Sequence, residues 1–515
     1  MTARLQRFTL AVLLLVACAD RGKGAEVSRT EPIDHAGAPA SMGSLASSGA
    51  QSTPESRAPT WYEHIAPIVV ARCATCHQPG GIAPVALHTY AAAAPLAKLM
   101  ADAVERGAMP PFLAQATDAC TPRYKYADDP HLTDAEKALL RAWADTGAPA
   151  GDPSQASTLP APAPRELPRA DSVLVLPAPI VVEARPHLDI HTCVIVDPQL
   201  TNDVYVIGRQ ITPGNPRILH HVLAYTIKPE RSSGSGRITR AELVETLQAT
   251  KHIGIGDRYD CFGGPGLNDS GLAYETLASR APGAAPAISP YGSGQPLARD
   301  ALVVLDLHFH PSAKREEDGD TKLSLMFAQQ RPALVSQPVL IGNFTETVDL
   351  PSGTGALIQQ PEEPVAEFRI PAGAQHHVEE MTWTWKLPSA PYGIRVAYAA
   401  THMHYVGRDM QVILENTDPQ LGESNEECLV QTPRWDFNWQ RGYGYQAAYD
   451  QLPLMNPGDI LRLRCTYDNS PSNPFLAAAL AEQGRDEPVD VTLGEDTLDE
   501  MCLASIGIIY PNPFP

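Results

Sequence analysis

Residues 394–404 read Ile394-Arg395-Val396-Ala397-Tyr398-Ala399-Ala400-Thr401-His402-Met403-His404. The apolar part of this stretch is typical of a β-strand, in which residues two apart project to the same side. His402 and His404 can therefore present their imidazoles to one point. Two imidazoles suit copper or zinc, and the remaining ligands decide between these metals. Because an H-x-H pair also occurs where no metal binds, the interpretation depends on finding those ligands.

Met501, in the stretch Asp499-Glu500-Met501-Cys502, is the further ligand that we expect for this pair. Its thioether is a soft donor, which favours Cu(I) over zinc and over hard cations. The sequence thus predicts a copper site that is built from two distant stretches of the chain, with His402, His404 and Met501 as ligands.

The composition limits the class of protein. A chain of 515 residues is too long for a single core, so about three domains of ordinary size are expected. The hydrophobic content of 43% is that of globular proteins. The formal net charge of -20 argues against nucleic acid or anionic lipid as a partner.

The first 17 residues predict export. Two arginines precede the apolar run Phe8–Ala17, which is too short to span a bilayer and is typical of a secretory signal peptide. The run ends in Leu15-Val16-Ala17-Cys18, which resembles the lipobox of bacterial lipoproteins. This resemblance implies cleavage before Cys18 and lipidation of that cysteine. Because Ala19 rather than aspartate follows, it also implies transfer to the outer membrane.

An ordinary signal peptide with an unmodified Cys18 is the alternative. No later stretch approaches the ~20 apolar residues of a transmembrane helix. We therefore expect an exported periplasmic or cell-surface protein that meets the membrane only through a lipid anchor. Residues 18–58, rich in Ala, Ser, Gly, Pro and Thr, are expected to be a flexible tether because they cannot bury enough apolar surface to fold.

Residues 59–150 contain Cys73-Ala74-Thr75-Cys76-His77, the C-x-x-C-H signature of covalent c-type haem attachment. Cys73 and Cys76 would hold one haem c through thioether bonds, and His77 would ligate its iron. A redox-active C-x-x-C pair is the alternative. For the sixth iron ligand we expect Met109, because the two prolines that follow it would stiffen its loop.

His88 and Met100 are the alternatives for the sixth ligand, although Met100 is more simply explained as a core residue. An iron with His and Met ligands stays six-coordinate and passes electrons rather than binding oxygen. Helical patterns at Ala93–Arg106 and Thr133–Thr146 complete a small all-α cytochrome. The order of the haem motif, the Met-Pro-Pro loop and Trp143–Pro149 resembles that of cytochrome domains fused to bacterial copper monooxygenases.

A Pro/Ala/Ser-rich linker at residues 151–172 is followed by short runs of β character. Their spacing predicts two all-β, jelly-roll-like sandwich domains, at residues 173–350 and 351–515. The expected strands are His191–Val196, Asp203–Val206, Ile218–Ile227, Ala301–His308, Thr321–Phe327, Ala366–Ile370, Thr382–Lys386, Arg395–Ala399, Met410–Leu414, Asp459–Thr466 and Leu503–Ile509.

The first β half offers a second candidate metal site. His220 and His221 are adjacent in a strand-like run, and they can bind one metal only if the backbone bends there, because neighbouring strand residues point to opposite faces. Two unrelated histidines are the alternative. The stretch Leu305-Asp306-Leu307-His308-Phe309-His310 contains a further H-x-H pair, which could chelate a metal alone or supply one imidazole to the first two.

The order of these pieces resembles a known family. An HH pair, then L-x-x-H followed by an aromatic residue, then H-x-H, then D-E-M-C resembles the copper type II, ascorbate-dependent monooxygenases, which include dopamine β-monooxygenase and peptidylglycine α-hydroxylating monooxygenase. The resemblance covers about residues 173–515 and includes Arg464-Cys465-Thr466-Tyr467. It implies an electron-transfer copper at His220, His221 and His308, and an oxygen-binding, catalytic copper at His402, His404 and Met501.

The resemblance also implies a Cys465–Cys502 disulfide, which would fix the strand that presents Met501. The pairing of Cys120, Cys193, Cys261 and Cys428 stays open. His310 is then an ordinary strand histidine, and the His376-His377 pair, outside the family order, is expected to be exposed.

Two positions depart from the peptidylglycine enzymes. Those enzymes have an arginine two residues before the H-x-H pair and a tyrosine four residues after the methionine, and this chain has Ala400 and Ser505 there. The arginine grips the substrate carboxylate, so a peptide C-terminus is not the expected substrate.

The resemblance implies hydroxylation of a substrate C–H bond with O2, which needs two electrons. Because bacteria are not expected to rely on ascorbate, we expect the fused haem to reload the copper at His220, His221 and His308. The expected partners are a small-molecule substrate, O2 and an electron donor: a quinol-derived reductant, a cytochrome or a small reductant. Two alternatives are a non-catalytic haem/copper electron carrier or redox sensor, and a copper-free β scaffold that displays a cytochrome.

Overall fold

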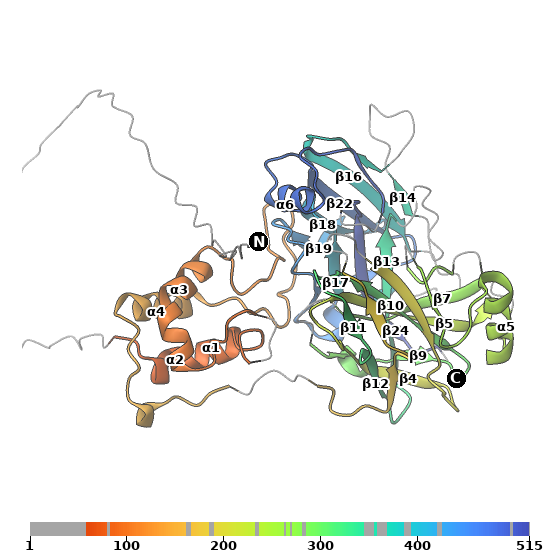
Figure 1. Ribbon diagram of the computed structural model, residues 1–515, viewed down its shortest axis with the longest axis horizontal. Helices are drawn as coiled ribbons and strands as arrows, with labels where there is room; N and C mark the ends of the chain where they lie inside the picture. The colour runs from red at the N-terminus through yellow and green to blue at the C-terminus, as the bar shows by residue number, and fades with distance from the viewer. Residues whose placement is uncertain are drawn as a thin grey trace, which may run out of the picture. The chain divides into compact units, whose positions relative to one another are not determined.

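The computed structural model describes residues 58–79, 83–160, 166–184, 190–231, 236–261, 264–267, 270–280, 285–343, 355–357, 368–385, 393–419, 425–494 and 498–513. Within these ranges the protein is mainly β, with several antiparallel sheets and a group of helices near the N-terminal end (Figure 1). This agrees with the predicted order of a helical region followed by β domains. The expected signal peptide, Cys18 and residues 18–57 of the tether lie outside the described residues.

The helical group contains α1 (Ala66–Arg72), α2 (Tyr90–Ala93), α3 (Ala97–Glu105) and α4 (Asp134–Asp145). α4 confirms the helix predicted at Thr133–Thr146: the Thr133 side chain accepts from the Glu136 N–H, and Glu136 accepts from the Thr133 N–H. The predicted helix at residues 93–106 is interrupted. Residues 94–96 form a 3-10 turn around Pro95, which has no N–H to donate, and α3 begins after it.

The helices share one apolar core. A π-helical turn at Trp61–Ile65 places Trp61 against Trp143 of α4, with ring centroids 5.8 Å apart. Ile65, Met100 and Leu140 are buried in the same core. No described helix has the length and apolar character that a membrane span requires.

Residues 172–327 form two five-stranded antiparallel sheets with the orders β1-β12-β4-β8, where β9 also pairs with β4, and β6-β3-β10-β5-β7. Apolar residues of both sheets, such as Val206 and Leu305, belong to one buried core, so the sheets pack face to face as a sandwich. The strands are β1 (Ser172–Val175), β3 (Ile190–Val196), β4 (Val204–Thr212), β5 (Leu219–Arg231), β6 (Arg258–Tyr259), β7 (Leu272–Arg280), β8 (Ala287–Ile288), β9 (Gln295–Leu297), β10 (Leu302–Phe309) and β12 (Lys322–Phe327), with β2 (Ile180–Val182) and β11 (Glu316–Asp318) as a separate pair.

The opposite face of the second sheet is covered by α5 (Arg240–Lys251), a helix that the sequence analysis did not predict. Leu243 and Leu247 of α5 pack with Ile195 and Val304 of the sheet. A Cys193–Cys261 disulfide belongs to the same cluster.

The second sandwich has sheets of order β13-β24-β17-β20, where β21 also pairs with β17, and β14-β16-β22-β18-β19. β22 alternates buried and half-buried residues, the pattern of a strand with one face on a core. β13 lies before residue 350, yet it pairs with the C-terminal strand β24. The elements are β13 (Leu334–Gly342), β14 (Gly355–Leu357), β16 (Gln375–Thr384), β17 (Ile394–His402), β18 (Gly407–Glu415), β19 (Glu426–Thr432), β20 (Gly442–Gly444), β21 (Leu454–Met455), β22 (Ile460–Asp468), α6 (Pro474–Glu482) and β24 (Leu503–Pro511), with β15 (Arg369–Ile370) and β23 (Val491–Thr492) as a separate pair.

Residues 112–127, expected to belong to the cytochrome, pack on the second sandwich instead. Phe112 is part of its core, and Cys120 forms a disulfide with Cys428 of β19. Tyr126 bridges to Tyr445, and its hydroxyl donates to the Leu429 carbonyl at 3.1 Å. These contacts attach the segment that follows the predicted Met109 loop to the β part.

Candidate metal centres

The first histidine cluster lies where β10 meets β5. His308 of β10 is directly opposite His221, and the next pair is Phe309 with Leu219, so His220 is an extra residue on β5. Such a β-bulge bends its strand and re-aims a side chain. The bulge supplies the bend that two neighbouring histidines need in order to face one point.

The three rings are close enough to share an ion. His308 Nδ1 lies 3.1 Å from His221 Nδ1, and His221 Nδ1 lies 3.3 Å from His220 Nδ1. Nitrogens bound to one ion at about 2.0 Å are at most about 4 Å apart, so both spacings fit. The ligand atoms of all three residues lie within 4.8 Å of one another. The structure therefore brings together a possible metal-binding triad of His220, His221 and His308.

The surroundings favour the neutral form of His221. Burial lowers the pKa of His221 well below its usual value, and repulsion from the neighbouring histidines, His308 first, lowers it further. The neutral imidazole is the form that binds a metal.

His191 is a site residue that the sequence analysis missed. It lies opposite His308 on β3, and the two rings stack with centroids 4.2 Å apart and an interplanar angle of 17°. The register between β3 and β10 makes this contact, and register cannot be read from residue spacing. The only signal in the sequence is its place at the start of the predicted strand His191–Val196.

The second cluster lies at the end of β17. The rings of His402 and His404 are nearly perpendicular, with centroids 5.2 Å apart. His402 Nδ1 lies 2.7 Å from Gln440 Oε1, and His404 Nδ1 lies 3.0 Å from the Asp499 carbonyl oxygen. Because these oxygens only accept, each Nδ1 carries the proton and donates it. Nε2 of each ring is then the nitrogen that could bind a metal, as is usual for histidine ligands with such partners.

Glu500 holds the Met501 segment beside His404. The buried Glu500 Oε1 accepts from the backbone N–H of His404 and, at 2.8 Å, from that of Met501. Burial raises the pKa of Glu500 to about 8, against the effect of these N–H donors. Tyr467 donates to the Met501 carbonyl at 2.9 Å, and the adjacent Cys502 is joined to Cys465, the pairing that the resemblance implied. Met501 is itself buried, and ligation by its sulfur stays a prediction.

The haem motif keeps both of its thiols outside the disulfides. Among the described cysteines, Cys73 and Cys76 are the two outside disulfides. Burial raises the pKa of the Cys73 thiol to about 12. His77 Nδ1 lies 2.9 Å from the Val85 carbonyl oxygen, so Nε2 is the nitrogen that could ligate an iron. These residues fit a haem, and its binding stays a prediction.

The remaining candidates for the iron ligand differ in burial. Met109 is half-buried in its loop, Met100 is buried in the helical core, and His88 is exposed. Met100 is therefore placed where a core residue is expected.

The extra histidines are placed differently. His310 is exposed at the end of β10, and His376 is exposed as expected. The expectation was wrong for His377, which is half-buried with Nε2 2.6 Å from Oε1 of the buried Glu379. A register shift of β16 at His376 turns its neighbour inward.

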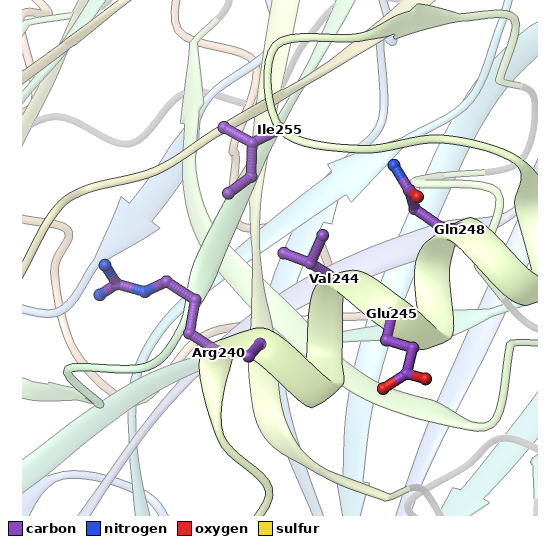
Figure 2. A pocket seen from close by; sticks show the side chains of 6 residues that line it. Arg240, Val244, Glu245, Gln248 and Ile255 are labelled. Carbon is purple, nitrogen blue, oxygen red and sulfur yellow. The ribbon is translucent and has the colours of Figure 1, made fainter.

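Ala400 and Ser505, the two positions that depart from the family, are directly opposite each other in β17 and β24. A surface hollow beside α5, lined by residues that include Arg240, Val244 and Ile255, contains none of the candidate ligands (Figure 2).

Comparisons with known proteins do not assign the chain to a family. No protein-family model and no curated protein matches the sequence. Among solved structures, the major capsid protein P2 from bacteriophage PM2 shares 10% identity with a TM-score of 0.22, over 66% of this chain and 97% of that chain. Allantoicase shares 11% identity at a TM-score of 0.14, over 58% and 90%. VP2 of infectious bursal disease virus shares 9% identity with a TM-score of 0.11, over 69% of this chain and 84% of that chain. Similarities this weak carry no functional conclusion.

Proposed function

We propose that this protein is an exported copper-dependent monooxygenase that hydroxylates a C–H bond of a small substrate with O2. The observation that carries the proposal is the pair of histidine clusters. Three histidines offer ligand atoms within 4.8 Å of one another, and two more donate their Nδ1 protons to carbonyl oxygens. The order of the HH, L-x-x-H, H-x-H and D-E-M-C motifs supports copper in both.

His220, His221 and His308 would hold the electron-transfer copper, and His402, His404 and Met501 the oxygen-binding copper. Bound copper supplies one-electron redox chemistry toward O2. Around the second site, Gln440 and the Asp499 carbonyl orient the two imidazoles, and Glu500 holds the backbone of His404 and Met501. A thioether at Met501 would favour the cuprous state.

The helical part would supply electrons through one haem c. Cys73 and Cys76 would attach it, and His77 and Met109 would ligate its iron. The three disulfides support a location outside the reducing cytoplasm, and Cys18 would be the lipid anchor. The electron donor would be a quinol-derived reductant, a cytochrome or a small reductant.

The test is metal analysis and oxygen uptake on protein expressed with periplasmic export. We expect two copper ions and one haem per chain, with O2 consumption that depends on copper, on a reductant and on a hydroxylatable substrate. Because the substrate is not identified, a panel of small alcohols, phenols and amines serves as the probe, with hydroxylated product detected by mass spectrometry.

Two outcomes would contradict the proposal. Haem without copper would indicate a cytochrome on a copper-free β scaffold. Copper and haem that titrate reversibly, without O2 uptake on any reductant, would indicate an electron carrier or a redox sensor.

A further inference from the structure

Residues Arg434-Trp435-Asp436-Phe437-Asn438-Trp439-Gln440-Arg441, here called the bridging segment, contact the helical part of the protein and both histidine clusters. The segment connects β19 to β20 and forms no strand. Its sequence is rich in aromatic and amide side chains, but nothing in that composition indicates which parts of the chain it joins. Its contacts in the structure show which parts of the chain it joins.

The two ends of the segment lie against residues on either side of Met109, the candidate iron ligand. The Arg441 guanidinium carbon is 4.9 Å from the centroid of Phe112, in the loop that follows the candidate iron ligand. A Cβ placed on Gly107, just before that ligand, would lie 3.2 Å from a guanidinium nitrogen of Arg434.

The middle of the segment contacts the second histidine cluster. Gln440, next to Arg441, places Oε1 2.7 Å from His402 Nδ1. Its amide nitrogen donates to the Phe437 carbonyl at 3.0 Å, which fixes the orientation of the amide. Trp435 donates from Nε1 to the His404 carbonyl at 3.0 Å. A continuous path of covalent and hydrogen bonds therefore leads from Arg441 to the His402 imidazole.

Phe437 lies between the two clusters. Its buried ring stacks on His220, with centroids 5.3 Å apart and an interplanar angle of 17°. The same ring meets His404 edge to face, with centroids 5.7 Å apart. Because one aromatic ring contacts an imidazole from each cluster, an electron that moves between them does not need to cross water.

We propose that the bridging segment carries electrons from the haem to the copper at His402 and His404 through Gln440, and on to the copper at His220, His221 and His308 through Phe437. This rests on the proposed function. It reverses the order expected from the sequence, in which the haem reloads the triad first.

The step is a one-electron transfer: ferrous iron becomes ferric as one cupric ion becomes cuprous. A one-electron reductant such as dithionite restores the ferrous haem, so two passes reduce both coppers.

Anaerobic stopped-flow measurements test the path without turnover. Oxidised, copper-loaded protein is mixed with limiting dithionite, and the haem absorbance reports reduction followed by reoxidation as the electron leaves. Freeze-quenched EPR reports the loss of each cupric signal. We expect Gln440→Leu to slow haem reoxidation at least about tenfold, which corresponds to about 1.4 kcal/mol of barrier. Phe437→Leu should delay only the cupric signal of the triad.

Conservative variants separate the path from simple structural support. Gln440→Glu keeps an acceptor oxygen and Phe437→Tyr keeps the ring, so both should restore the rates. Trp439→Leu is the matched control, because no described ring contact joins Trp439 to a histidine, and it should behave like wild type.

Copper content, measured on every sample, keeps the outcomes apart. The path would be overturned if Gln440→Leu and Phe437→Leu each bound two coppers and transferred electrons at wild-type rates. It would also be overturned if Trp439→Leu slowed the transfer as much as these two variants do. Either result would leave the monooxygenase proposal standing. Wild-type protein that binds no copper would refute both.

Discussion

Glu500 and His404 are joined through the backbone: the buried carboxylate accepts the N–H of His404, and the same oxygen accepts the N–H of Met501. Glu500, the residue before the methionine in the D-E-M-C motif, therefore connects the candidate ligands His404 and Met501. In Glu500→Leu both N–H groups lose their acceptor, and each loss should lower the free energy of unfolding by about 1–3 kcal/mol.

Glu500→Gln keeps a carbonyl oxygen that can accept both hydrogen bonds. It is therefore the matched control, and its free energy of unfolding should fall much less than that of Glu500→Leu. Urea unfolding of the metal-free proteins measures the difference. Equal stability of the leucine and glutamine variants would show that this contact does not organise the site.

The triad makes a direct prediction about copper content. His308→Ala removes the residue that faces both His221 and His220, and bound copper should fall from two ions to one per chain. His310→Ala, two positions along at the exposed end of β10, should keep both ions. Metal analysis after dialysis measures the ratio, and loss of copper in both variants would argue against the assignment.

Met501 should matter more for cuprous than for cupric copper. In Met501→Leu the shape is nearly conserved but the soft donor is lost, so affinity for Cu(I) should fall while Cu(II) binding by the two imidazoles persists. Competition with a Cu(I)-selective chelator measures the change. Met410→Leu, which replaces a buried core methionine of the same sandwich, is the control. Identical Cu(I) affinities in the two variants would exclude Met501 as a ligand.

The Cys120–Cys428 disulfide should hold residues 112–127 on the second sandwich. The double variant Cys120→Ser/Cys428→Ser is expected to lose about 2–5 kcal/mol of stability. Limited proteolysis should then cut within 112–127, while the wild type resists unless reduced. Cutting at the same rate in both would mean that the packing of Phe112 and Tyr126 is sufficient.

Asp203 gives a pH-dependent prediction. The hydrogen bond from Arg237 lowers its pKa to about 2, whereas the unfolded value is about 3.9. Its stabilisation is therefore present above about pH 4 and is lost as the pH falls toward 2. Asp203→Asn should destabilise the protein at pH 6, and the gap from wild type should narrow at pH 3. The midpoints of urea unfolding measure this difference in stability. A difference that does not change with pH would contradict the low pKa of Asp203.

The sequence predicted the parts of the molecule that follow from local periodicity. Apolar or alternating runs marked β17 and β22, and the helical pattern at Thr133–Thr146 marked α4. Adjacent His220 and His221 could be nominated, with the condition that the backbone bends.

Contacts between distant segments were not predictable in this way. Gln440 and Phe437 gain their roles only when the loop between β19 and β20 is placed against two histidine clusters. His191 needs the register of β3, and the pairing of Cys120 with Cys428 needs the tertiary fold. The helix α5 was missed although the sequence carries a start signal for it, the capping box of Thr239 and Glu242.

The bulge at His220 means that the triad depends on a residue count as well as on residue identity. Deleting Leu219 would straighten the strand and turn one imidazole to the other face of the sheet, with every ligand still in the sequence. A related chain that keeps the two histidines but lacks the inserted position would then look intact in a motif search and yet bind no ion there.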